Sequence, residues 1–332
     1  MKLWGQKGLS MNMYNPFYLI SGALLVGGLV VAVSTDSKVS GWLGMEINVM
    51  GFLGVLSVRS FMSISVGLKY FIIQVLGSSL FLLGIFVLYC GEFNVSSVVC
   101  QLGGVLAEVG LFCKAGVFPF HGWVPSVVSA GDWVSSWLVM GVQKLAPIYM
   151  MSVWSSSFLL YIGVVGLSFA GAVGGLNQLS VRGVLAYSSL VHGGWMLVGL
   201  FHSNELFLLY FIGYLIQLSV LVGVCFVVEA NKGGSMVVSS LGGVMSLSLA
   251  GLPPMAGFLF KLMVFLSVAN LGVLVAPVAG SIVALLFYLR LMFSFMLGYD
   301  FKLEDGAWKS VALFVSFNGL CYVTFIVVLG LL

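Results

Sequence analysis

Charged side chains are scarce in this chain of 332 residues. They make up 7% of the sequence, whereas hydrophobic residues make up 61%. A typical soluble domain carries about 25% charged residues. A soluble fold of this length could not cover its surface with so few charges, so a soluble globular protein is excluded. The net charge of +3 is also too small and too scattered for binding nucleic acid.

Cysteine and histidine are also few, and their spacing excludes the usual metal sites. The five cysteines all lie in or beside apolar runs, at Cys90, Cys100, Cys113, Cys225 and Cys321. Their spacing does not match zinc or iron–sulfur ligands, and we expect them to be small buried hydrophobic residues. No metal-binding pattern is formed by the three histidines, His121, His192 and His202. The chain is therefore expected to ligate neither a metal nor an electron carrier.

Long apolar runs of roughly 17–25 residues, without the alternation typical of a strand, dominate the sequence. Because lipid cannot satisfy backbone polar groups, only helices or a closed barrel can span a membrane. The sequence therefore predicts an all-α polytopic membrane protein with about 11 transmembrane helices in a single transmembrane domain, 1–332. The predicted spans are 16–35, 41–58, 68–90, 97–116, 133–152, 156–176, 184–201, 205–229, 236–252 continuing to about 269, 274–297 and 309–331.

Two of these spans contain residues that break helices. One break is predicted at Gly116–Pro119 and the other at Gly251–Gly257, within GLPPMAGFLFK. Proline and glycine inside a span free backbone carbonyls and create half-helix ends. Two such breaks about five spans apart indicate inverted five-helix repeats, as in transporters. The repeats are predicted at approximately 16–152 and 156–297, followed by a C-terminal helix at approximately 309–331.

Basic residues in the short loops predict the orientation of the chain. Lys38 falls on one side of the membrane, and a larger group falls on the side of the N-terminus, namely Lys2, Lys7, Arg59, Lys69, Arg182, Lys232, Lys302 and Lys309. This asymmetry places the N-terminus on the negative side, and an odd number of spans places the C-terminus opposite. A cleavable signal peptide is not expected, because a full-length span follows the first lysines.

Five ionisable residues fall inside or beside the broken and apolar spans, where a charge costs at least a few kcal/mol and indicates function. They are Glu46, Lys114, Lys144, His192 and Lys261. Burial disfavours the charged form of amines and carboxylates, so such groups can exchange protons. If buried water joins them, a series of this kind can pass protons laterally through a membrane.

Structural interpretations of these residues stay open. Glu46 can instead pair with Arg59 or a lipid headgroup, and Lys114 can extend its amine towards the membrane surface. His192 is explained equally well by a hydrogen bond to a backbone carbonyl and by a relay step. Glu108 is an additional candidate partner of Lys114, although six residues is not a helical spacing.

Several segments, in a fixed order, resemble a known family. They are GMEINVMGF at 44–52, LKYFIIQ at 68–74, KAGVFPFHGWVP at 114–125, QKLAPI at 143–148, LNQLSVRGVLAYSSLVHGGWM at 176–196, GLPPMAGFLFK at 251–261 and FYLRLMF at 287–293. Over about residues 15–295 the chain resembles the antiporter-like, proton-pumping subunits of respiratory complex I, NADH:ubiquinone oxidoreductase. Among these it is similar to mitochondrial subunit 2, in the shortened animal form with eleven spans.

This resemblance implies a function and a role for each candidate residue. It implies a membrane-arm subunit that translocates protons, driven by NADH oxidation and ubiquinone reduction in other subunits. Glu46 and Lys114 would form the first half-channel pair, with Lys144 as the central relay. Lys261 would face the exit or a neighbouring subunit. The chain departs from the family pattern outside this series, at Ser65, Ser126 and Phe260.

The resemblance also implies partners and a location. The chain is expected to carry no redox centre and to bind no cofactor, since NAD, FMN, iron–sulfur clusters and ubiquinone belong elsewhere in the complex; structural phospholipids can contact it. Expected partners are other complex I membrane-arm subunits, including neighbouring antiporter-like subunits, and membrane lipids, but not nucleic acid. The expected location is the mitochondrial inner membrane, with the N-terminus in the matrix and the C-terminus towards the intermembrane space. The alternative functions are a stand-alone cation/proton antiporter and a non-conducting structural subunit.

Overall fold

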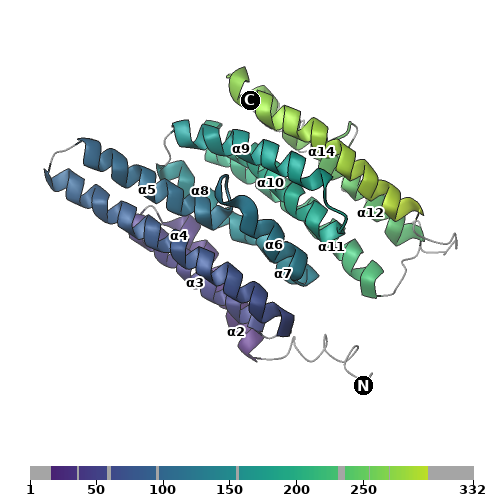
Figure 1. Cartoon of the computed structure of the whole chain (residues 1–332), viewed down its shortest axis with the longest axis horizontal. Helices are drawn as coiled ribbons and strands as arrows, with labels where there is room; N and C mark the ends of the chain where they lie inside the picture. The colour runs from purple at the N-terminus through teal and green to yellow at the C-terminus, as the bar shows by residue number, and fades with distance from the viewer. Residues whose placement is uncertain are drawn as a thin grey trace. The chain divides into compact units, whose positions relative to one another are not determined.

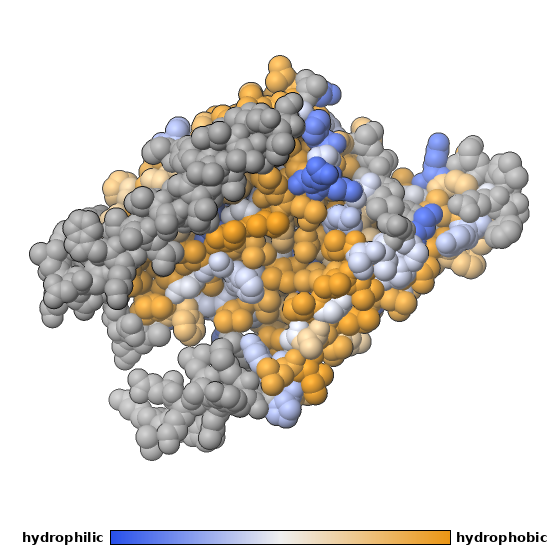
Figure 2. Space-filling view, turned by 180° about the vertical axis from the view of Figure 1, so that it is seen from behind, coloured by the Kyte–Doolittle hydropathy of each residue, from blue (hydrophilic) through white to orange (hydrophobic). Residues whose placement is uncertain are grey.

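The chain is a bundle of apolar helices. The computed structural model describes residues 16–35, 37–57, 61–94, 97–154, 157–230, 236–253, 255–268 and 270–297, and these contain helices but no strand. Eight helical segments among them are long and apolar enough to cross a membrane. Figure 2 shows a surface on which hydrophobic residues dominate and hydrophilic residues form small patches. The prediction of an all-α polytopic membrane protein is therefore confirmed.

The chain divides into two compact units, Met1–Leu160 and Tyr161–Leu332. Every span predicted before residue 298 is matched by one helix or by two consecutive helices. The predicted span 309–331 lies outside the described residues. So do several residues used for the orientation or the cysteine analysis, namely Lys2, Lys7, Arg59, Lys232, Lys302, Lys309 and Cys321.

Four long helices open the first unit, and Figure 1 shows them running alongside one another. They are α2 (Pro16–Ser34), α3 (Lys38–Ser57), α4 (Phe61–Asn94) and α5 (Ser97–Ala115), and the closest pairs are α2 with α3 and α4 with α5. Glycines allow this approach, since small residues let helix backbones come close. A Cβ added at Gly110 of α5 would lie 2.6 Å from the backbone nitrogen of Phe81 on α4.

After α5 the first unit continues in short helical pieces. These are the 3-10 helix η1 (Phe120–Gly122), α6 (Trp123–Ala130), α7 (Trp133–Met140) and α8 (Val142–Trp154). The break predicted at Gly116–Pro119 is present, and Gly116 has the left-handed φ of +69° that favours glycine. The span predicted at 133–152 is not one uninterrupted helix, because Gly141 leaves the helical region with φ −109° and ψ −87°.

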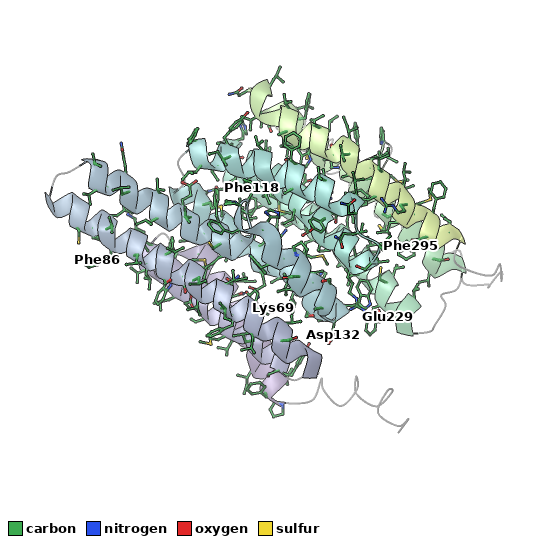
Figure 3. All side chains as sticks on the ribbon, in the orientation of Figure 1. Lys69, Phe86, Phe118, Asp132, Glu229 and Phe295 are labelled. Carbon is green, nitrogen blue, oxygen red and sulfur yellow. The ribbon has the colours of Figure 1, made fainter. Side chains whose placement is uncertain are left out.

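The second unit is built around one buried helix. α9 (Ser157–Leu176) runs across the boundary into this unit and is followed by α10 (Val181–His202), α11 (Asn204–Ala230), α12 (Met236–Ala250), α13 (Ala256–Ser267) and α14 (Leu271–Leu297). From Gly183 to Leu200, every residue of α10 except Tyr187 is buried. Glu229 and Phe295 mark the C-terminal ends of α11 and α14 in Figure 3.

The second predicted break separates α12 from α13. Gly251 has a φ of +81°, again in the left-handed region. Gly257, in the first turn of α13, lies so close to α12 that its amide is 3.4 Å from the side-chain oxygen of Ser248. Both helix ends created by this break therefore lie within the protein.

The close contact of α4 and α5 gives a first prediction. Gly110→Ala would place a methyl group against the backbone of α4, and overpacking of this kind costs typically about 1–3 kcal/mol. Gly104→Ala is the matched control on the same helix, because a Cβ there meets nothing within 4 Å. We expect thermal unfolding in detergent to begin at a lower temperature for Gly110→Ala and not for Gly104→Ala. Equal stability of the two variants would contradict this packing.

Candidate functional site

An ion pair lies in the first unit, at the end of α5. The Lys114 amine donates to Oε1 of Glu46 on α3 over 2.6 Å, and the side chains are 1% and 25% exposed. Hydrogen bonds between two charged groups are shorter and stronger than neutral ones. Lys114 is also in the last turn of its helix, where the helix dipole favours a cation. Of the candidate residues, the structure thus brings Glu46 and Lys114 into direct contact.

Lys144 lies in the first turn of α8, immediately after the break at Gly141. Its backbone N–H donates to the carbonyl of Gly141 over 3.0 Å, and its side chain is buried, with the residue 4% exposed. The neighbouring Gln143 accepts a hydrogen bond from the Tyr70 hydroxyl over 2.9 Å. Among the described residues, the buried Nε2 of Gln143 has no hydrogen-bond partner. A side-chain amide donor without a hydrogen-bond partner therefore adjoins Lys144 in the sequence.

Tyr70 and Gln74 connect the surroundings of these two lysines. Both belong to α4 and both are buried; the Gln74 side chain donates to the backbone carbonyl of Lys114 over 3.2 Å. Neither residue was predicted from the sequence to be part of the site. A spacing of four within LKYFIIQ puts them on one helical face, and that spacing is the signal that could have found them.

Lys261 has a different partner from Lys114. Its amine reaches back from α13 and donates to the carbonyls of Ala250, over 2.7 Å, and Leu249, over 3.4 Å. These carbonyls end α12, and the last carbonyls of a helix have no partner within it. Lys261 thus caps the helix on the other side of the break, and as a cation it complements the negative end of the helix dipole.

His192 is buried in the middle of α10. Its Nδ1 lies 2.8 Å from the hydroxyl of Tyr210, and its Nε2 lies 3.2 Å from the hydroxyl of Tyr288. The tyrosines come from α11 and α14 and were not predicted from the sequence. Glu108, the additional candidate, is fully buried on α5.

No group of three or more potential metal ligands is found among His, Cys, Asp and Glu of the described residues. Among the described candidate residues, the first unit holds the ion pair and Lys144, and the second unit holds His192 and Lys261. Ionisable side chains buried beside breaks in apolar helices are typical of membrane proteins that transport ions.

Comparison with known proteins gives the family. Residues 35–287 match the family described as "NADH:quinone oxidoreductase/Mrp antiporter, TM". The chain is 38% identical over 279 residues to NADH-ubiquinone oxidoreductase chain 2 of Mytilus edulis, which covers 84% of this chain and 86% of that protein. It is 30% identical over 338 residues to chain 2 of Anopheles gambiae, covering 95% and 98%. The chain belongs to the NADH-ubiquinone oxidoreductase chain 2 family, as the resemblance of its segments indicated.

Solved structures show the same fold in more distant proteins. A chain of respiratory complex I from Thermus thermophilus aligns with a TM-score of 0.77 and 22% identity, covering 94% of this chain and 78% of that one. A chain of the Mrp complex from Dietzia sp. DQ12-45-1b aligns with a TM-score of 0.73 and 17% identity, covering 87% and 64%. The helical scaffold is thus common to a respiratory complex and an Mrp complex.

The contact of Lys261 with the end of α12 gives a second prediction. Lys261→Met would remove the cap from the carbonyl of Ala250, and a hydrogen bond from a charged donor contributes about 1.5–3 kcal/mol. We expect hydrogen exchange of the backbone at 250–258 to become roughly tenfold faster, because the break opens more often. Lys69→Met makes the same chemical change at an exposed position of α4 (Figure 3) and should leave that segment unchanged. Unchanged exchange in both variants would show that Lys261 does not hold the break.

Proposed function

We propose that the chain is a membrane-arm subunit of respiratory complex I and that it translocates protons through Glu46, Lys114, Lys144 and Lys261. NADH oxidation and ubiquinone reduction take place in other subunits and drive the transfer. Membership in the chain 2 family supports this assignment. The observation that carries the mechanism is the ion pair between the buried amine of Lys114 and the half-buried carboxylate of Glu46.

Energies of the right size support a gating role for this pair. Breaking a fully buried ion pair typically costs about 3–5 kcal/mol, because a charge is left uncompensated; this is an upper bound here, since the Glu46 side chain is 25% exposed. Moving one charge against a membrane potential costs about 2.3 kcal/mol per 100 mV. The energy needed to separate Glu46 from Lys114 is therefore of the same order as the energy needed to move one proton against the potential.

The other groups continue the path in this proposal. Lys144 receives the proton from the region of Lys114 and exchanges it with Lys261, and one proton leaves on the positive side. Buried water bridges the gaps, and the open amide donor of Gln143 is a suitable partner for such a water. Inverted repeats at about 16–152 and 156–297 would give each half of the path its own broken helix.

The location and partners follow from the same assignment. We place the chain in the mitochondrial inner membrane with its N-terminus in the matrix and its C-terminus towards the intermembrane space. Its partners are other membrane-arm subunits, including neighbouring antiporter-like ones, and membrane lipids. It contributes to the enzyme as a proton-conducting part and carries no redox centre or cofactor of its own.

The decisive experiment replaces the central lysine. Lys144→Met, in the assembled complex reconstituted into liposomes, should abolish proton pumping and slow coupled electron transfer, because the relay loses its titratable group. Lys69→Met is the control at an exposed lysine. Proton uptake and NADH oxidation are measured together, with assembly checked on native gels.

The same measurements distinguish the alternatives. Normal pumping by an assembled Lys144→Met complex would point to a non-conducting structural subunit. The Mrp-like fold makes an antiporter the other candidate. Sodium-dependent proton exchange by the isolated chain in liposomes would favour that function over the proposed one.

A further inference from the structure

The two helix breaks share one local pattern. The chain reads FCKAGVFP at 112–119 and LSLAGLPP at 247–254, so that in each break an alanine is followed by a glycine, with a proline three residues after that glycine. In both, the glycine has a left-handed φ and its amide donates to the carbonyl three residues before it. When the glycines are aligned, the carbonyl of Leu249 in the second break corresponds to that of Lys114 in the first.

These two corresponding carbonyls have different donors. At the first break, the side chain of Gln74 on α4 donates to the carbonyl of Lys114 over 3.2 Å, and the amine of Lys114 pairs with Glu46. At the second break, the amine of Lys261 itself donates to the carbonyl of Leu249, over 3.4 Å. A glutamine therefore holds the end of the first helix, whereas a lysine holds the end of the second.

A glutamine is also present at the second break. Gln217 belongs to α11, which directly precedes the broken pair α12 and α13, just as the helix of Gln74 directly precedes α5. The residue is 1% exposed, and among the described residues its buried Nε2 has no hydrogen-bond partner. Burying an amide donor without a partner costs free energy. The counterpart of Gln74 is thus in place, but its donor is not used.

The side chain of Gln217 lies beside the last turn of α12. Its Oε1 and the carbonyl oxygen of Ser248 both lie within 3.2 Å of the position that a Cβ on Gly257 would occupy, so glycine at this position leaves room for the amide. Ser248 immediately precedes Leu249. The last side-chain bond of glutamine has a broad, roughly two-fold rotational preference, and rotation about it exchanges the positions of Oε1 and Nε2. Such a rotation turns the donor towards the end of α12.

We propose that Gln217 is a positioning residue that caps the carbonyl of Leu249 when Lys261 leaves it, so that the second break alternates between a lysine-capped and a glutamine-capped state. The first break has the arrangement of the second state, with a glutamine on the carbonyl and the lysine amine on another partner. The exchange keeps a donor on a helix end that would otherwise lose it. Its part in transport rests on the proposed function, in which the released amine of Lys261 exchanges its proton.

Two substitutions, alone and together, test the exchange of caps in the assembled complex. Gln217→Leu alone removes a donor that is not in use, so it should not speed hydrogen exchange of the backbone at 250–258. In Lys261→Met the glutamine holds the carbonyl, and there the same change should speed exchange by about a further fivefold, the effect of one amide–carbonyl hydrogen bond. An equal effect of Gln217→Leu in both backgrounds would overturn the proposal, because the effects of independent sites add.

Gln101→Leu is the control for this cycle. It makes the same chemical change at an exposed position of α5, and it should alter exchange at 250–258 in neither background. If it had the same effect as Gln217→Leu in the Lys261→Met complex, the response would not belong to Gln217 and the proposal would fail.

Proton pumping distinguishes the exchange of caps from the proposed function. Gln217→Leu with Lys261 intact should lower pumping in liposomes about fivefold, because the glutamine-capped state loses its hydrogen bond. Undiminished pumping in this variant, in an assay where Lys144→Met stops pumping, refutes the exchange and leaves the proposed function standing. Normal pumping by Lys144→Met contradicts the proposed function instead, and the hydrogen-exchange cycle then decides whether Gln217 is a cap.

The structure of the Lys261→Met complex gives the answer if the double variant does not assemble. We expect Nε2 of Gln217 about 3 Å from the carbonyl oxygen of Leu249. A water molecule on that carbonyl, with the amide of Gln217 turned away from it, would overturn the proposal.

Discussion

The first unit has to bury the amine of Lys114 and hold it 2.6 Å from Glu46, and its packing depends on this ion pair. A buried ammonium group needs a nearby partner, because desolvation otherwise makes the charged form highly unfavourable. The partner comes from another helix, so α3 has to lie close enough to α5 for the carboxylate of Glu46 to reach the amine. Gly77 of α4 contributes to this: a Cβ there would lie 2.8 Å from Cγ of Lys114, so its absence leaves room for the lysine stem.

The helix breaks serve the same requirement. Where a helix stops inside the protein, its last carbonyls need donors. At the first break, Gln74 donates to the carbonyl of Lys114 itself. At the second, the donor is the amine of Lys261, which bonds to Ala250 and Leu249. Side-chain donors thus form hydrogen bonds with the backbone carbonyls at the helix ends. These hydrogen bonds allow both the helix breaks and the polar side chains to lie within an apolar bundle.

The helices could be predicted well from the sequence, because apolar runs and helix-breaking residues act locally along the chain. Apolar runs of this length have few alternatives to a membrane span, and the breaks at Gly116 and Gly251 are followed within three residues by a proline. The break at Gly141 was missed because no proline adjoins it, and a glycine inside a span is usually tolerated. With 43 glycines in the chain, glycine alone could not identify this position.

The candidate residues were predicted more completely than their partners. A lysine in an apolar run is visible in the sequence, and so is a carboxylate such as Glu46. The hydrogen bond between Tyr70 and Gln143 joins residues 73 positions apart, and that between His192 and Tyr288 spans 96. A buried tyrosine also reads as an ordinary aromatic core residue, so only the folded chain reveals that its hydroxyl belongs to the site.

Lys114 and Lys261 look alike in the sequence, but their partners give them different chemistry. The carboxylate of Glu46 can take up a proton, so the charge state of its pair with Lys114 can change by transfer within the pair. Backbone carbonyls cannot be protonated under these conditions, so the partner of Lys261 is fixed. A change in charge at Lys261 therefore requires exchange with another group or with water. If the chain conducts protons, the first site is suited to switching and the second to release.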